Sequence, residues 1–360
     1  MPFFSAEKFR EIVSGRRRGL LPAAVRALLA AAEPVYRYVV ARKNRRFDAD
    51  ESLATRVEAP VISVGNLTVG GTGKTPFVVW LAKWFRARNV PVTLISRGYG
   101  EQHGPNDEAR EIAASLPAVP HLQNPDRIAA ARQALAENKN AVLILDDAFQ
   151  HRRLARDLDI VLIDALEPFG YGRLLPRGLL REPISSLARA HVVALSRADA
   201  ISVEQRKEIQ ATVQRHAPTA VWLELVHAPV ALIDCEGNSE PLHHWQGKRL
   251  AAFAGIGNPA GFQHTLQQCG LKPAAFRVLA DHQVYDSRTI DSLASWLSRL
   301  GSLAGVICTH KDLVKLPQDL LGDVPLRALQ IALEIGQGEE KLTLLLTALA
   351  QRFAKKDPEA

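Results

Sequence analysis

Residues 61 to 85 contain the feature that most constrains the fold of this chain. A short apolar run at 61–64 leads into a glycine-rich turn, and an apolar-periodic segment follows from Phe77 to Phe85. A strand, loop and helix in this order form the context of a phosphate-binding loop, in which backbone N–H groups and a helix N-terminus surround phosphate oxygens. We therefore expect a nucleoside triphosphate to bind the loop residues Thr68, Val69, Gly70, Gly71, Thr72, Gly73, Lys74 and Thr75.

Two residues of this loop have specific expected roles. Lys74 is placed to contact the β- and γ-phosphates, and the hydroxyl of Thr75 to contact Mg²⁺. The loop departs from the usual pattern G-x-x-x-x-G-K-[ST], because Thr68 occupies its first position. Val69 stands where the partitioning type of P-loop ATPase carries its signature lysine, which argues against that class.

A second motif ends another apolar run. Residues 141–145 are followed directly by Asp146 and Asp147, the arrangement in which a carboxylate holds Mg²⁺ or its waters in P-loop enzymes. Adjacent side chains on a strand point to opposite faces, so one acid is expected to face the metal and the other a different partner. Gln150 and His151 follow and supply polar groups at the same edge of the sheet.

Three other segments carry candidate groups. Asp107, within Asn106-Asp107-Glu108, is a carboxylate that can take a proton from an attacking hydroxyl. His282 follows Asp281 and is a candidate to orient or charge-balance such a base. The loop at 174–183 contains Arg181, and arginine side chains bind phosphate through paired hydrogen bonds.

The pattern of the whole chain predicts an α/β fold. Apolar runs alternate with helical patterns through the middle of the sequence, which indicates a parallel sheet flanked by helices, as in P-loop NTPases. We expect the P-loop core at 47–225, a smaller α/β domain at 226–335, and a C-terminal helix at 336–360 that returns to the core.

The N-terminal region 1–46 is basic and amphipathic. Leu21, Val25, Leu28 and Leu29 fall on one helical face, with arginines and a lysine on both sides of the apolar stretch. Such a helix can lie on an anionic membrane surface, or pack on the core with a solvated basic rim. The net charge of +7 favours anionic partners, but the chain contains no nucleic-acid recognition motif, so nucleic acid is not an expected partner.

These motifs together resemble the tetraacyldisaccharide 4'-kinase family, the lipid A 4'-kinases of Gram-negative bacteria. The resemblance extends in order from about residue 20 to about residue 335. The Thr68 that breaks the general P-loop pattern is typical of this family. The matching stretches are 65–76, 96–100, 125–127, 146–151, 180–183, 254–259 and 281–282.

The resemblance implies a reaction and its site. The γ-phosphoryl group of ATP would pass, with Mg²⁺, to the 4'-hydroxyl of a tetraacylated glucosamine disaccharide 1-phosphate, a lipid A precursor, at the cytoplasmic face of the bacterial inner membrane. The family's catalytic base maps onto Asp107 and its partner histidine onto His282, although Asn106 and Gln283 depart from the family pattern. The residues expected to bind substrate are Asn66, Tyr99, Arg127, Gln150, His151 and Arg181.

Two other functions remain open from the residues alone. A regulatory P-loop NTPase would hydrolyse nucleotide without a lipid acceptor, and a nucleotide-binding scaffold would turn over nothing. Ser196-Arg197-Ala198-Asp199 is close to the guanine motif N/T-K-x-D, but arginine replaces the lysine. A preference for guanine is therefore not predicted.

Overall fold

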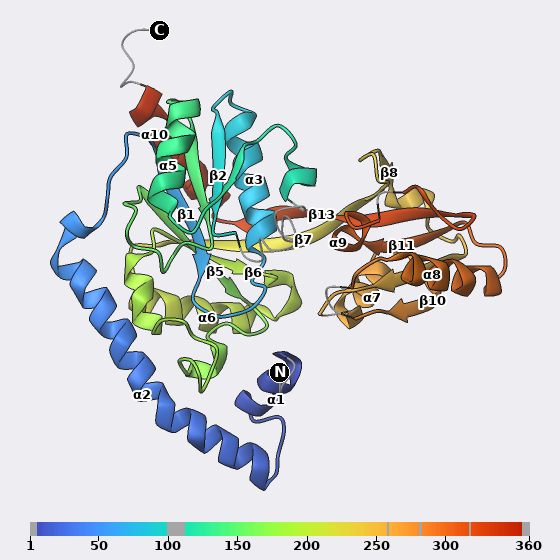
Figure 1. The fold of residues 1–360 in the computed structure, drawn as a ribbon, viewed down its shortest axis with the longest axis horizontal. Helices are drawn as coiled ribbons and strands as arrows, with labels where there is room; N and C mark the ends of the chain where they lie inside the picture. The colour runs from blue at the N-terminus through green and yellow to red at the C-terminus, as the bar shows by residue number, and fades with distance from the viewer. Residues whose placement is uncertain (1–5, 99–111, 258, 281–282, 317, 355–360) are drawn as a thin grey trace. The chain divides into compact units, whose positions relative to one another are not determined.

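The computed structural model describes residues 6–98, 112–257, 259–280, 283–316 and 318–354. The chain divides into two compact units. Among the described residues, unit 1 holds those within 6–98, 118–226 and 334–354, and unit 2 those within 112–117 and 227–333. The strands β7 (Val221–Ile233) and β13 (Val324–Gln337) both continue from one unit into the other (Figure 1).

Unit 1 is built on a parallel sheet. Its strands follow the order β7-β6-β5-β1-β4-β2-β3, and every pair in this series is parallel. Most of them are continuous apolar runs, as expected for strands covered on both faces. Their bounds are β6 (Val192–Ser196), β5 (Leu158–Asp164), β1 (Val61–Asn66), β4 (Val142–Asp146), β2 (Val92–Ser96) and β3 (His121–Gln123).

Helices cover both faces of this sheet. The helix α3 (Lys74–Arg86) follows β1 and leads to β2, whereas α5 (Arg127–Glu137) leads from β3 back to β4. The two connections run in opposite directions across the sheet, so right-handed crossovers place their helices on opposite faces. The helix α6 (Val203–His216) packs on the face that α5 covers, and α10 (Glu339–Ala354) ends the described chain.

Strand order determines where a ligand can bind. Strand β1 lies between β4 and β5, and Val64 of β1 is in register with Asp146 of β4. The connections that follow β1 and β5 leave toward opposite edges of the sheet. Open parallel sheets bind ligands beyond the carboxyl ends of their strands at such a reversal.

Two helices precede the sheet of unit 1. The short helix α1 (Ala6–Val13) buries Ile12 and Val13. The helix α2 (Leu20–Ala49) has 30 residues and runs along the outside of unit 1 in Figure 1. Tyr36 of α2 packs against the apolar cluster between the sheet and α6.

Unit 2 has its own parallel strands and apolar clusters. Strands β10 (Pro273–Val278), β9 (Leu250–Ala254) and β11 (Gly305–Thr309) pair in this order, and β11 pairs with β13. The short strands β8 (Ser239–Pro241) and β12 (Leu320–Leu321) add antiparallel pairs. The helices are α7 (Pro259–Gln268), α8 (Ser287–Arg299) and α9 (His310–Leu313).

The predicted α/β fold with a parallel P-loop-like core and an N-terminal helix is confirmed. Helix α3 begins at Lys74, three residues before the apolar-periodic segment that starts at Phe77, because the end of the phosphate-binding loop is itself the first turn. Asp126 and Ser202 cap the N-termini of α5 and α6 through their side chains. Helix α1 was not predicted.

Candidate active site

The phosphate-binding loop connects the end of β1 to the start of α3. Gly70 and Gly73 have φ angles of +125° and +78°, which glycine adopts readily and other residues rarely do. Lys74 is the first residue of α3, so the unpaired N–H groups of its first turn face the loop. The Asn66 amide donates to the hydroxyl of Thr72 over 3.1 Å and holds the loop to the end of β1. The result is a backbone cradle suited to an anion.

A second segment is hydrogen-bonded along this loop. The N–H of Val69 donates to the carbonyl of Leu179 over 2.8 Å, and the N–H of Arg181 donates to the carbonyl of Leu67 over 2.7 Å. This antiparallel contact, centred on the bridge between Thr68 and Leu180, brings Arg181 to the nucleotide site.

Asp147 is at the centre of a charged group beside the loop. Its carboxylate lies 3.5 Å from Lys74 Nζ and accepts two hydrogen bonds from Arg181, of 3.0 and 2.9 Å. Burial works to raise the pKa of Asp147, but the charges of Lys74 and Arg181 and the hydrogen bonds from both hold it below its ordinary value. The φ of Asp147 is +48°, a conformation that Asp and Asn tolerate better than most residues.

Asp146 is the last residue of β4 and is only 6% exposed. The guanidinium of the buried Arg127 donates to its carbonyl over 3.4 Å. Within the described residues, no group of three or more His, Cys, Asp or Glu side chains is gathered for a metal. A carboxylate and the hydroxyl of Thr75 are nevertheless hard oxygen donors of the kind that Mg²⁺ prefers, and Mg²⁺ sites often use one or two protein carboxylates plus phosphate oxygens.

Arg197 supports the loop from the end of β6. Its guanidinium donates to the carbonyl of Gly71 over 3.0 Å and forms an ion pair with Asp164 at the end of β5. The loop is therefore held to three strand ends: by covalent continuity to β1 and through Arg197 to β5 and β6.

Gln150 and His151 follow the two acids. The Gln150 amide donates to the carbonyl of Asn66 over 2.7 Å, so its side chain lies against the start of the phosphate-binding loop. His151 Nε2 is buried without a hydrogen-bond partner among the described residues. The pKa of His151 is lowered to about 4 by burial and by four nearby cations, which are Arg127, Arg156, Lys43 and Arg153.

Helix α2 is hydrogen-bonded to the loop that carries Arg181. The hydroxyl of Tyr36 donates to the carbonyl of Arg181 over 3.0 Å. The buried carboxylate of Glu33 accepts from the N–H of Leu174 over 3.2 Å and forms an ion pair with Arg37. These contacts fix the 174–181 loop to one face of α2.

The solvent-exposed side of α2 carries a row of apolar side chains. Leu21, Leu28 and Val35 are 77%, 73% and 68% exposed, and Tyr38 and Val39 are exposed farther along the helix. None of the described helices is both long and apolar enough to span a membrane.

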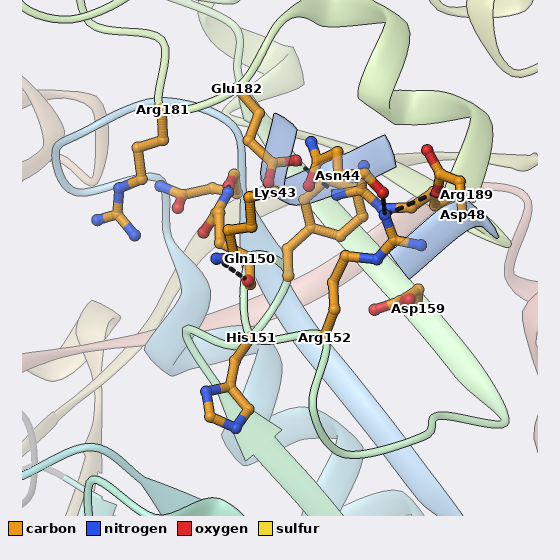
Figure 2. A network of polar contacts seen from close by, with 12 residues as sticks. Lys43, Asn44, Asp48, Gln150, His151, Arg152, Asp159, Arg181, Glu182 and Arg189 are labelled. Carbon is orange, nitrogen blue, oxygen red and sulfur yellow. Dashed lines mark hydrogen bonds and ion pairs between the residues drawn. The ribbon is translucent and has the colours of Figure 1, made fainter. Parts of the chain in front are cut away.

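A pocket of about 460 Å³ lies at the C-terminal end of α2. Its walls come from two segments, residues 43–53 and residues 150–153. Figure 2 shows Lys43, Gln150, His151 and Arg152 in this region, close to the pair formed by Glu182 and Arg189.

In unit 2, a buried carboxylate joins three segments. Asp312 is 1% exposed and accepts hydrogen bonds from the N–H of Gly255, the hydroxyl of Thr309 and the hydroxyl of Tyr285. Asp281 and His282 lie outside the described residues, and Tyr285 is near them in the sequence.

The family model described as tetraacyldisaccharide-1-P 4'-kinase matches residues 25–351. The chain belongs to the tetraacyldisaccharide-1-P 4'-kinase family. A member named tetraacyldisaccharide 4'-kinase from Anaeromyxobacter dehalogenans is 37% identical over 351 residues, which is 92% of each chain. One from Halothermothrix orenii is 36% identical over 337 residues, 86% of this chain and 87% of the relative.

A solved structure supports the same family. The structure of LpxK from Aquifex aeolicus, described as an "apo" form in complex with ATP, has a TM-score of 0.72 and 28% sequence identity to this chain. The match covers 90% of this chain and 99% of that one. The resemblance predicted from the motifs is thus confirmed at the level of sequence family and of fold.

The structure gathers part of the predicted site of this kinase family. Asn66, loop residues 68–75, Asp147, Gln150 and Arg181 are joined by the contacts described above. Arg127 and Asp146 are buried beside them, and His151 lines the pocket at the end of α2. Tyr99, Asp107 and His282 lie outside the described residues, so their roles stay predictions.

Two arginines that contact the phosphate-binding loop were not predicted from the sequence. Arg197 was noted only as a departure from a guanine motif, and its position at the end of β6 was the signal that it reaches the ligand edge. Arg10 of α1 lies against the phosphate-binding loop, because its Nη2 is 2.5 Å from where a Cβ on Gly70 would be. Its segment precedes residue 25, where the family match begins.

Proposed function

We propose that this protein transfers the γ-phosphoryl group of ATP to the 4'-hydroxyl of a tetraacylated glucosamine disaccharide 1-phosphate, the lipid A precursor. The observation that carries the proposal is the group formed by Lys74, Asp147 and Arg181 at the phosphate-binding loop of a chain in this kinase family. The ATP complex of the Aquifex relative supports ATP as the phosphoryl donor.

Loop residues 68–75 would hold the triphosphate. The backbone N–H groups of the loop and of the first turn of α3 surround the phosphates, and Lys74 neutralises charge on the β- and γ-phosphates. In this structure Lys74 lies against Asp147, so the phosphates of ATP would compete with the Asp147 carboxylate for a lysine that is already placed at the loop. Phosphoryl transfer needs mainly such positioning and charge neutralisation.

Thr75 and Asp146 are the residues best suited to hold Mg²⁺. Asp146 ends the strand next to β1, whereas the Asp147 carboxylate is occupied by Arg181 and Lys74. We therefore assign Asp146 to the metal and Asp147, the other candidate acid, to holding Arg181 and Lys74 beside it. Mg²⁺ bound there would neutralise charge on the transferred phosphoryl group.

The acceptor side of the reaction rests on several proposed roles. Asp107 takes the proton from the attacking 4'-hydroxyl, with His282 as its partner. Asn66, Gln150, His151, Arg181 and Tyr99 bind the acceptor sugar and phosphate groups, and Arg127 supports Asp146 from behind.

The acceptor is a lipid, so the enzyme would act at a membrane surface. The exposed apolar row of α2 has the composition of a surface-docking helix, and the basic residues near its C-terminal end favour anionic phospholipid. We place the protein at the cytoplasmic face of the bacterial inner membrane, as a peripheral or monotopic protein.

Purified protein incubated with radiolabelled ATP and the acceptor in neutral detergent micelles tests the proposal. We expect labelled phosphate on the disaccharide, lost in Lys74→Ala and in Asp107→Ala, with ATP binding retained in Asp107→Ala. ATP hydrolysis that is equally fast without lipid would instead support a regulatory NTPase. Folded protein that transfers nothing would contradict the kinase proposal.

A further inference from the structure

The helix α1 is anchored beside the phosphate-binding loop, beyond the end of β1 (Figure 1). Ile12 and Val13 at its C-terminal end are 3% and 2% exposed. The guanidinium of Arg177, from the loop that also carries Arg181, donates to the carbonyl of Val13 over 2.8 Å. Arg26 of α2 donates to the carbonyl of Ile12 over 3.4 Å. Two arginines thus bind the carbonyl end of α1, where a helix favours positive charge, and hold the helix next to the nucleotide site.

Arg10 lies on the side of α1 that meets the loop. It belongs to the last turn of the helix, and its guanidinium occupies the space beside Gly70. A Cβ placed on Gly70 would lie 2.5 Å from Arg10 Nη2 and 3.7 Å from Arg10 Cζ. Apart from the chain neighbours of Gly70, no other described residue comes within 4 Å of that point. Arg10 is therefore the side chain that faces the loop at this glycine.

The positive charge of Arg10 is only weakly balanced. Glu167, the acid with which it pairs, lies 4.0 Å from Arg10 Nε, and that distance is too long for a hydrogen bond. Glu167 accepts a hydrogen bond from the hydroxyl of Tyr171. The Arg10 side chain is 46% exposed, and arginine stays protonated at physiological pH. The guanidinium therefore brings a full charge and several donors to the edge of the loop.

The other cations at the loop are already bound to acids. Lys74 and Arg181 both contact Asp147, and Arg197 pairs with Asp164 while it donates to the carbonyl of Gly71. In each case the carboxylate is 3.5 Å away or closer, whereas the acid paired with Arg10 is at 4.0 Å. Of these four cations, Arg10 loses least when it turns to a phosphate.

The transfer of a γ-phosphoryl group calls for such a cation. Its transition state spreads negative charge over three equatorial oxygens, which P-loop enzymes neutralise with Mg²⁺, the loop lysine and an arginine brought in from outside the loop. Lys74 is the loop lysine, and Arg10 comes from a separate helix. The planar guanidinium offers paired donors that match phosphate oxygens.

We propose that Arg10 contacts the γ-phosphate of ATP and neutralises the charge that develops on it during transfer. The inference rests on the proposed function, because it requires ATP on the loop as the phosphoryl donor. Rotation of the side chain carries its terminal nitrogens from Gly70 to the phosphate, while α1 stays anchored. The bond from the γ-phosphorus to the ADP oxygen breaks as the bond to the acceptor oxygen forms, and Arg10 neither gives nor takes a proton.

The test compares ATP with ADP, because only ATP carries the γ-phosphate. The variants are Arg10→Gln, which removes the charge but keeps a long polar side chain, and Arg10→Lys, which keeps the charge. Arg18→Gln is the matched control, since Arg18 is an exposed arginine of the same N-terminal segment. Calorimetry in the presence of Mg²⁺ measures both affinities, and transfer from ATP to the acceptor disaccharide in neutral detergent micelles measures kcat.

We expect Arg10→Gln to weaken ATP binding about ten-fold and to leave ADP binding unchanged, as for a lost hydrogen bond to a charged group. The kcat should fall about a hundred-fold, because the contact is strongest in the transition state. Arg10→Lys should show the same selective loss to a smaller degree, and Arg18→Gln should resemble wild type. Thermal unfolding establishes that each variant is folded, and the lysine variant carries the test if the glutamine variant is not.

Three results would overturn the proposal. Equal losses of ATP and ADP affinity would show that Arg10 only supports the loop. An unchanged kcat would show that Arg10 does not act in transfer, and a raised kcat would show that it obstructs the site. Wild-type protein that transfers nothing would instead overturn the kinase proposal, and the ATP and ADP affinities would still decide whether Arg10 contacts the γ-phosphate.

Discussion

Arg181 donates two hydrogen bonds to the carboxylate of Asp147, at 3.0 and 2.9 Å, while Lys74 of the phosphate-binding loop lies 3.5 Å from the same group. Three segments far apart in sequence therefore meet at one carboxylate. The arrangement pre-positions two cations before any nucleotide is bound, which lowers the reorganisation needed during phosphoryl transfer.

Replacing Arg181 by lysine tests how much its contact with Asp147 contributes to catalysis. Lysine keeps the charge but lacks the planar guanidinium whose Nη1 donates to both carboxylate oxygens of Asp147. We expect kcat to fall about ten-fold to a hundred-fold, with a smaller change in ATP affinity. Steady-state kinetics measure both. Arg173→Lys should be nearly silent, because the exposed Arg173 guanidinium lies just before that loop and contacts Glu33 only at 3.7 Å. A silent Arg181→Lys would contradict the role.

Removing Arg197 should weaken nucleotide binding. Arg197→Ala deletes the link from Asp164 to the carbonyl of Gly71, so the loop loses a support on one side. We expect about a ten-fold weaker affinity for ATP by calorimetry. Arg206→Ala, which breaks an ion pair with Glu224 elsewhere in unit 1, is the control and should leave the affinity unchanged.

Gly65 is expected to be intolerant of any side chain. A Cβ there would lie 2.7 Å from both the Cβ and the backbone N of Phe149. Gly65→Ala should lower the free energy of unfolding by about 1–3 kcal/mol, measured by urea denaturation. Gly71→Ala, whose Cβ would meet nothing within 4 Å, should leave the stability near wild type. Equal stabilities for the two variants would show that the backbone shifts freely.

The lowered pKa of His151 predicts a specific pH dependence of stability. The ordinary pKa of 6.5 applies to the unfolded chain, whereas the folded value is about 4. As the pH falls from about 6.5 to about 4, the unfolded chain gains a proton that the folded protein does not, so the free energy of unfolding decreases. This loss of stability is complete below about pH 4. His151→Gln should remove it, and parallel curves for the two proteins would refute the assignment.

The exposed apolar row of α2 predicts vesicle binding. The double replacement Leu28→Ser and Val35→Ser should reduce partitioning to anionic vesicles about ten-fold or more, because two apolar side chains no longer enter the membrane. Leu166→Ser is the control, since Leu166 is an exposed leucine outside α2. Co-sedimentation measures the difference, and equal losses would argue against a specific docking face.

Local patterns were sufficient to predict much of unit 1. The phosphate-binding loop and the acids after β4 follow from strand, turn and helix signals close in sequence, and the parallel order brings their ends together. The link from Arg181 to Asp147 was not predictable, because it depends on a loop that pairs with residues 67–69 over a hundred positions away. The same holds for Arg197, whose partners lie on β5 and in the phosphate-binding loop.

The pocket at the C-terminal end of α2 was also beyond sequence reasoning. The lysine and arginines around residues 43–46 were interpreted only as the basic flank of an amphipathic helix, and Gln150 and His151 only as polar groups at the sheet edge. Only the packing of α2 onto the core brings the two sets to one cavity. Periodicity identifies which helical face is apolar, but not what the polar face meets.

The hydrogen bonds from α2 to the 174–181 loop fix the rotation of that helix. Tyr36 and Glu33 bind the loop on one side, so α2 cannot turn about its axis without breaking contacts that reach the backbone of Arg181. A bilayer that receives the apolar row of α2 therefore meets the nucleotide site at one set angle. In the proposed membrane-docked state, α2 would hold the membrane and the phosphate-binding loop at one angle, so that a lipid leaving the bilayer would reach the loop with its sugar rings in a single orientation.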